Sequence, residues 1–433
     1  MEYTYLLTIC IILVSTKVFS LFTGKFQMPQ VVGALFAGLL LGPAMLNVLQ
    51  PSEFLHNLAE LGVIVIMFGA GMETSLDDLK KSGKMSFLVA LFGVIIPLGL
   101  GALLSFGFNK EGILLEHIFI GVVLTATSVS ITVETLKELG KLSTKVGNTI
   151  LAAALIDDIL GLICLTIVTS LGGSGVNIFV VIIKILLFFV FAIAVGMVSK
   201  KFFDWMTTTT HNHNLHRFPV AAFALCLFMS WSAEVWFGVA DIIGAFAAGV
   251  IISMTPKGHY IASKFSPLSY LLLTPIFFAN IGLGVVLPEM DTTLIIFSVL
   301  LVIIAILSKL IGCGAAAKIA GFNIQKSIQI GLGMACRGEV ALIVANKGRT
   351  MGLLPDQFFG PIIIMVVCCA VFTPILLKQA FKQSNVHNTH HVSSLTERFH
   401  LRSLADVTTH DILINKNDTT SNDTLEDNIA EEV

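Results

Sequence analysis

The chain is 433 residues long, with 55% hydrophobic residues, only 12% charged residues and a formal net charge of −2. Its mean hydropathy is +0.89. These values lie far outside those of soluble domains and indicate an integral membrane protein. The near-neutral charge argues against nucleic acid as a partner. The seven cysteines lie in apolar segments without CxxC or cysteine–histidine metal spacing, so we expect no redox site and no cofactor.

Apolar segments long enough to cross a bilayer recur along most of the chain. The first, Tyr5–Phe22, lacks a basic region before it and is expected to be a retained span, not a cleaved signal peptide. About 13 candidate spans are predicted, near residues 3–22, 29–46, 58–76, 85–107, 114–137, 146–171, 176–199, 217–237, 238–255, 265–287, 292–316, 326–346 and 357–378. The expected fold class is therefore an all-α polytopic membrane protein.

Basic residues gather in the loops after odd-numbered spans, for example within residues 80–84 and 137–145. The positive-inside rule then places the N-terminus outside and the C-terminus in the cytoplasm. From Gln383 the composition becomes polar, and the chain ends with several acidic residues. We expect residues 1–382 to form the transmembrane domain and residues 383–433 a disordered cytoplasmic tail.

Two adjacent aspartates, Asp157 and Asp158, interrupt the apolar stretch 146–171. A charged aspartate at the centre of a bilayer costs roughly 2.5–3.5 kcal/mol, so the pair requires a partner or a function. Neighbouring helical residues point about 100° apart. One carboxylate can therefore face a buried basic group while the other faces water, which suits an ion and proton site.

Two spans contain polar, helix-breaking interruptions. The fifth span carries Thr125, Thr127, Ser128 and Ser130, and the twelfth carries a glycine-rich stretch, 331–339, that ends with Arg337 and Glu339. Discontinuous spans at corresponding positions of two halves indicate a transporter site. The spacing predicts two inverted six-helix repeats, joined by the seventh span, with two crossed discontinuous helices. The alternative for the threonine and serine run is ordinary small residues at helix contacts.

Lys309 lies in the middle of the eleventh span, where a lysine must pair or lose its proton. We expect it to pair with Asp157 or Asp158, since about 15 Å of apolar helix separates it from either membrane face and makes snorkelling unfavourable. Arg337 and Glu339 are expected to bond the free ends of the broken helices, a structural role, with direct participation in transport as the alternative.

Two other polar groups have open interpretations. His211, His213 and His216 form a cytoplasmic cluster that suits pH sensing or metal uptake, although a plain polar loop is the simpler interpretation. Glu234 and Asp241 flank the junction of the eighth and ninth spans, as a solvated loop or an ion funnel.

Several motifs together resemble a known family. They are TATSVSITVETLKELGKLS (125–143), ALIDDILGL (154–162) and MACRGEVALIVANKG (334–348), with further matches in PQVVGALFAGLLLGP (29–43), FGAGMETSLDDL (68–79) and DIIGAFAAGVIIS (241–253). From about Val14 to Lys382 the chain resembles the monovalent cation:proton antiporter-2 family, and within it the bacterial sodium/proton antiporters. Potassium-efflux relatives usually have a non-acidic residue at the position of Asp157, so this chain resembles the two-aspartate, electrogenic branch. Lys309 matches the lysine that accompanies that branch.

The resemblance implies a homodimer with a dimerisation part, residues 1–78 and 217–290, and a mobile core, residues 85–171 and 291–382, linked by the helix 176–199. It implies exchange of Na⁺ or Li⁺ for H⁺ at Asp158, assisted by Thr127 and Ser128, with Asp157 paired to Lys309 when no cation is bound. Thr125 and Ser130 would stabilise the broken helix. No resident metal is needed, because oxygen ligands suit these ions.

Other functions stay open on the sequence. A K⁺/H⁺ antiporter of the same fold would show similar residues, and a gated cation channel is a second alternative that would conduct without proton coupling. An enzyme is not expected, because neither a Ser/His dyad nor an HExxH motif is evident. The plasma membrane is the expected location.

Overall fold

The structure is a computed structural model that describes residues 4–25, 28–74, 76–174, 178–209, 217–285 and 290–386. His211, His213 and His216, and the tail beyond residue 386, lie outside the described residues. Throughout the part that is described, the regular structure is helical.

The first half of the chain forms eight α-helices. They are α1 (Thr4–Lys25), α2 (Gln30–Leu41), α3 (Glu53–Met72), α4 (Leu76–Phe108), α5 (Leu114–Thr125), α6 (Val129–Glu138), α7 (Lys145–Thr169) and α8 (Ile178–Thr209).

The second half forms eight more, with π-helical turns after α9 and between α11 and α12. They are α9 (Arg217–Ser232), α10 (Asp241–Ser253), α11 (Gly258–Leu268), α12 (Thr274–Leu283), α13 (Thr292–Ile319), α14 (Ile324–Gly333), α15 (Glu339–Thr350) and α16 (Phe359–Val386). The last helix continues to Val386, a few residues into the segment predicted as a disordered tail.

Among the described residues, ten helical segments are long and apolar enough to cross a membrane, and α2 and α10 are shorter apolar helices. The predicted all-helical membrane architecture is therefore confirmed. The spans expected fifth and twelfth are each divided, into α5 with α6 and α14 with α15. The count of thirteen spans and the inversion of the repeats stay predictions.

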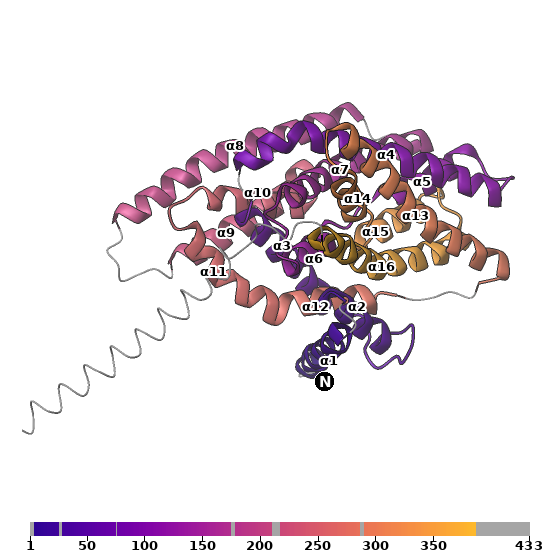
Figure 1. Ribbon diagram of the computed structural model, residues 1–433, viewed down its shortest axis with the longest axis horizontal. Helices are drawn as coiled ribbons and strands as arrows, with labels where there is room; N and C mark the ends of the chain where they lie inside the picture. Colours follow the sequence, from indigo (N-terminus) through magenta and orange to yellow (C-terminus); the bar gives the residue numbers. More distant parts are fainter. Residues whose placement is uncertain are drawn as a thin grey trace, which may run out of the picture. The chain divides into compact units, whose positions relative to one another are not determined.

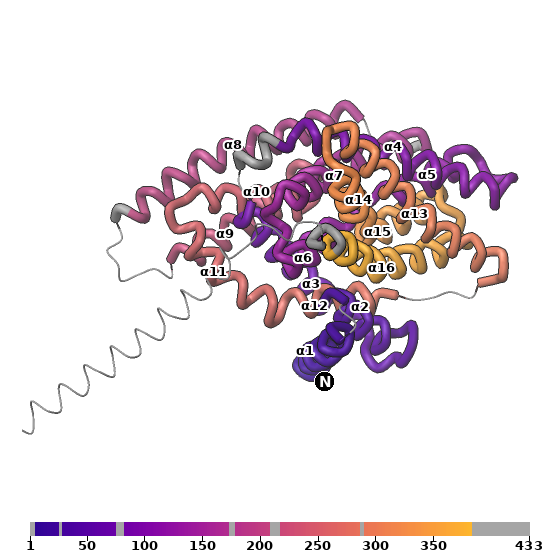
Figure 2. The backbone as a smooth tube through the Cα atoms, viewed as in Figure 1, coloured from indigo at the N-terminus to yellow at the C-terminus, as the bar shows by residue number. Residues whose placement is uncertain are grey.

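Packing between the helices follows two sets of neighbours (Figure 1). In one set, α3 packs on α10, α10 on α9, and α2 on both α1 and α12. In the other, α4 packs on α5, α7 and α13, and α13 packs on α14. The long helix α8 contacts α7 from the second set and α10 from the first. The colour order in Figure 2 shows that each set combines segments from both halves of the chain.

The short helices α2 and α10 share a pattern of small residues, GALFAG (33–38) and GAFAAG (244–249). A Cβ atom at Gly38 would collide with the backbone of Ala279 in α12, and one at Gly249 with the backbone of Phe68 in α3. Each pattern thus brings its helix into backbone contact with a helix from the other half of the chain, as small residues do at membrane helix interfaces. The matching use of this pattern supports an internal repeat.

We predict that Gly249→Ala destabilises the protein by about 1–3 kcal/mol, because an added methyl must separate two packed backbones. The matched control is Gly107→Ala, where a Cβ would meet nothing within 4 Å. Thermal unfolding of the purified protein in detergent, followed by size-exclusion chromatography, measures the difference. Equal transition temperatures for the two variants would contradict the close contact.

Candidate functional site

The two broken helices meet at their breaks. The backbone leaves the helix at Ala126–Ser128, between α5 and α6, and at 334–338, between α14 and α15. The Ser128 amide donates to the Cys336 carbonyl at 2.9 Å, and the Thr132 hydroxyl donates to the Gly333 carbonyl at 2.9 Å. Backbone groups freed by one break are thus satisfied by the other, as irregular backbone in a membrane requires. The two discontinuous helices predicted from the sequence are present, and they cross.

A buried ion pair lies beside this crossing. The Lys309 ammonium on α13 is 2.7 Å from Oδ1 and 2.9 Å from Oδ2 of Asp157 on α7. The two residues are only 0% and 2% exposed. The Thr127 hydroxyl, in the first break, donates to Asp157 Oδ2 at 2.8 Å. A buried pair is stable only when good geometry and further hydrogen bonds offset its desolvation, and Asp157 has both.

Asp158 has a different environment from its neighbour. It is less buried than Asp157 as a residue, yet its Oδ2 atom is inaccessible and has no hydrogen-bond partner in the part of the chain described. Thr127, expected to assist Asp158, contacts Asp157 instead, and the Ser128 hydroxyl lies 3.2 Å from that of Ser130. Asp158 therefore keeps acceptor capacity that no side chain uses.

Arg337 lies at the centre of the crossing and is 0% exposed. Its guanidinium donates to the Thr127 hydroxyl at 3.5 Å and to the Ala305 carbonyl of α13 at 3.4 Å. Arg337 thus ties the second break to the first break and to α13, whereas the sequence predicted contacts with helix ends. Ala305 lies one helical turn before Lys309 on α13. Arg337 therefore contacts the same stretch of α13 that carries Lys309.

Glu339 is the first residue of α15, where a carboxylate interacts favourably with the positive end of the helix dipole. Its Oε2 atom is buried and has no hydrogen-bond partner among the described residues. Thr125 uses its hydroxyl within its own helix, donating to the Val122 carbonyl at 2.7 Å. Glu339 therefore has the expected position at a helix end, while the hydrogen bond of the Thr125 side chain stays within α5.

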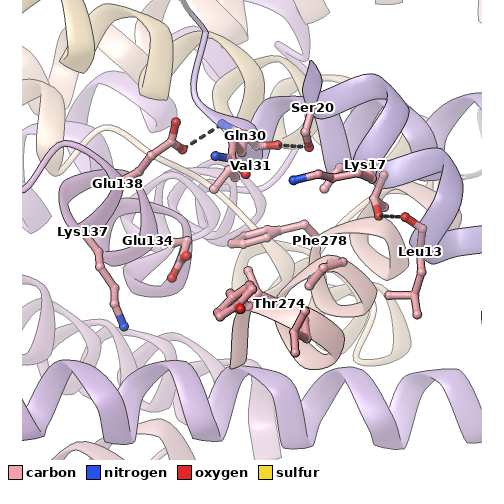
Figure 3. Close-up of a pocket in the computed structure, with 15 residues that line it drawn as sticks. Leu13, Lys17, Ser20, Gln30, Val31, Glu134, Lys137, Glu138, Thr274 and Phe278 are labelled. Atoms are coloured by element: carbon pink, nitrogen blue, oxygen red, sulfur yellow. Dashed lines mark hydrogen bonds between the residues drawn. The ribbon is translucent and has the colours of Figure 1, made fainter. Parts of the chain in front are cut away.

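A cavity of about 600 Å³ lies beyond α6, bordered by α1, α2 and the segment leading into α12 (Figure 3). Figure 3 shows Glu134, Lys137 and Glu138 along one side of it and Lys17 pointing toward them from α1. Neither aspartate is among its lining residues.

The end of α6 is bound to its surroundings beside that cavity. The Glu138 carboxylate accepts a hydrogen bond of 2.7 Å from the backbone N–H of Gln30, at the start of α2. Lys137 forms an ion pair of 3.3 Å with Glu73 at the end of α3. These contacts join α6, the helix that follows the first break, to α2 and α3 of the other packing set.

Sequence reasoning missed two features of the site. The cavity is built from residues of four separate segments, and no spacing within one segment predicts that the four come together. Gly93 on α4 lies directly against the ion pair, so that a Cβ there would be 3.3 Å from both Asp157 Oδ1 and Lys309 Nζ. A single glycine in an apolar span carries no sequence signal of such a position.

Crossed broken helices around a buried carboxylate–lysine pair define a class of secondary-transporter folds. The chain matches the family model described as sodium/hydrogen exchanger, transmembrane, over residues 8–383. It therefore belongs to the sodium/hydrogen exchanger family, which confirms the resemblance found in the sequence.

The chain matches several relatives over nearly the whole length of each relative. The chain is 40% identical to the probable Na⁺/H⁺ antiporter GerT of Bacillus cereus, over 86% of this chain and 98% of the relative. It is 38% identical to the Na⁺/H⁺-K⁺ antiporter GerN of the same organism, over 88% and 97%. It is 35% identical to a Na⁺/H⁺ antiporter of Enterococcus hirae, over 87% and 97%.

The fold is also that of a solved structure, the sodium proton antiporter MjNhaP1 of Methanocaldococcus jannaschii. The match has a TM-score of 0.69 at 17% identity and covers 91% of this chain and all of that chain. At this identity the likeness concerns the fold alone.

We predict that Thr127→Val lowers stability by about 1–3 kcal/mol, because Asp157 loses a donor and Arg337 an acceptor while both stay buried. Thr135→Val is the matched control, since the buried Thr135 hydroxyl donates only to Ile131 on its own helix. Thermal unfolding in detergent compares the two. A Thr127→Val protein as stable as the control would show that the hydroxyl does not hold the pair.

Proposed function

We propose that this protein exchanges Na⁺ or Li⁺ for H⁺ across the membrane, and that Asp158 is the carboxylate for which cation and proton compete. The observation that carries the proposal is the difference in hydrogen bonding between the two adjacent aspartates. Asp157 is bound by Lys309 and Thr127, whereas Asp158 Oδ2 is buried and has no hydrogen-bond partner among the described residues. Membership of the sodium/hydrogen exchanger family and the names of the relatives support the same exchange.

Competition at one carboxylate makes the exchange obligatory. A protonated Asp158 has no charge left for a hard cation, and a cation-bound Asp158 has no free charge for a proton. Hydroxyl and backbone oxygens at the crossing, including those of Thr127 and Ser128, would complete the cation's ligands, since such ions prefer oxygen. Cation entry would break the Asp157–Lys309 pair, and the buried Lys309 ammonium would then give up its proton in addition to the proton that leaves Asp158. Two protons per monovalent cation would make the cycle electrogenic.

Alternating access would come from motion between the two packing sets. The proposed dimerisation part, residues 1–78 and 217–290, contains α1–α3 and α9–α12, and the core, residues 85–171 and 291–382, contains most of α4, α5–α7 and α13–α16. Dense packing within each set supports this division. A homodimer would hold the first part fixed while the core exposes the site to either face.

The direction of transport would follow from the ion gradients. An inward proton gradient across the plasma membrane would drive the cation out of the cell, while the N-terminus is proposed to lie outside and the C-terminus in the cytoplasm. K⁺ is a second candidate substrate, because the relative GerN, 38% identical, is named a Na⁺/H⁺-K⁺ antiporter.

We predict that Asp158→Asn abolishes exchange, because an amide can neither release a proton nor attract a cation. In everted vesicles, addition of Na⁺, Li⁺ or K⁺ should then produce no dequenching of a pH-sensitive dye. The matched control is Asp356→Asn, which removes a carboxylate that is 89% exposed on the described surface and should keep wild-type exchange. Wild-type dequenching by Asp158→Asn would remove this residue from its proposed role.

Lys309→Gln is expected to act more mildly. The carboxylate that binds the cation survives, so exchange should persist, while stability or electrogenicity falls because Asp157 loses its partner. Membrane voltage in proteoliposomes and thermal unfolding measure the two effects. Lys318→Gln, at the exposed end of the same helix, is the control. A stable and fully electrogenic Lys309→Gln protein would contradict the role of the pair.

A further inference from the structure

Helix α4 approaches the ion pair with bare backbone. Gly93 is buried, and a Cβ built there would lie 3.3 Å from Asp157 Oδ1, 3.3 Å from Lys309 Nζ and 2.7 Å from the Cys313 sulfur. Elsewhere on α4, a Cβ at Gly99 or Gly107 would meet nothing within 4 Å, and one at Gly101 would lie 2.9 Å from the Gly121 backbone of α5. Among the described glycines of α4, only Gly93 has the ion pair among its nearest neighbours.

The three neighbours of this turn can move to different extents. Real Cβ atoms essentially never approach another heavy atom within 3.0 Å, and 3.3 Å is tighter than nine in ten real contacts. Asp157 is held by the Thr127 hydroxyl at 2.8 Å. The Lys309 ammonium is carried by a flexible chain of four carbons. An added methyl would therefore shift the Cys313 sulfur and displace the ammonium before it moves the carboxylate.

We propose that Gly93 is a positioning residue for the exchange reaction. Its missing side chain lets the Lys309 ammonium lie within hydrogen-bond distance of both Asp157 oxygens. The strength of that pair then sets how strongly Lys309 opposes the entry of a cation. This inference rests on the proposed function, in which cation entry must break the pair.

A methyl group at position 93 should therefore weaken the Asp157–Lys309 pair and make cation binding more favourable. Electrostatic attraction in a dry site falls steeply as an ideal pair is lengthened. We expect Gly93→Ala to lower the Na⁺ KM about three- to tenfold, while the maximal rate changes less. A purely structural defect would instead lower the maximal rate and the amount of folded protein and leave the KM unchanged.

The experiment measures Na⁺-dependent exchange in proteoliposomes over a range of Na⁺ concentrations, with thermal unfolding of each variant. Gly99→Ala is the matched control on the same helix. Gly93→Ala/Cys313→Ala, compared with Cys313→Ala alone, removes the sulfur from the tightest contact and tests the methyl without that overlap. Gly93→Ala in the Lys309→Gln background tests whether the effect passes through the ammonium.

The inference requires a lower Na⁺ KM in both proteins that carry Gly93→Ala with Lys309 present, and no such change for Gly99→Ala or in the Lys309→Gln background. A KM within about twofold of the parent in folded Gly93→Ala/Cys313→Ala overturns it. An equal decrease in the Lys309→Gln background overturns it too. If the wild-type protein exchanges no Na⁺ for H⁺, the proposed function fails first, so the two failures are distinguishable.

Discussion

The ion pair between Lys309 and Asp157 is the constraint on which the rest of the site depends. Both groups are almost completely buried in helices that cross the apolar part of the protein. Neither charge is tolerable there alone, because removing one partner leaves an uncompensated charge in a medium that solvates it poorly. The hydroxyl of Thr127 and the close approach of α4 complete an environment in which the two charges neutralise each other.

The crossing of the broken helices provides a hydrogen bond to Asp157 of this pair but none to Oδ2 of the adjacent Asp158 in the described residues. The breaks exchange hydrogen bonds, and Arg337 joins both of them to α13, so an unwound backbone can exist at this depth. Asp158 Oδ2 receives no such hydrogen bond from the described residues, and neither do Arg337 Nε and Glu339 Oε2 at the same crossing. The crossing therefore satisfies Asp157 and leaves buried hydrogen-bonding capacity beside it.

The sequence predicted the features whose local cost is high. Charges within apolar spans must find partners, so Lys309 could be assigned to the aspartate pair. A threonine and serine run in one span and a glycine-rich stretch in the other predicted the two breaks. Finer choices depend on side-chain direction, which spacing does not determine. Thr127 therefore contacts Asp157 where Asp158 was expected, and Arg337 reaches α13 where a helix end was expected. Gly93 was missed because its role is the absence of atoms.

The long separation between Asp157 and Lys309 along the chain has a consequence for biogenesis. The pair joins residues 152 positions apart, so α7 leaves the ribosome and enters the bilayer well before α13 exists. During that interval the two acidic groups on α7 lack their basic partner, and an unpaired charge is costly in lipid. Insertion of α13 then supplies the lysine that pairs with Asp157, so the ion pair forms late, as a product of assembly.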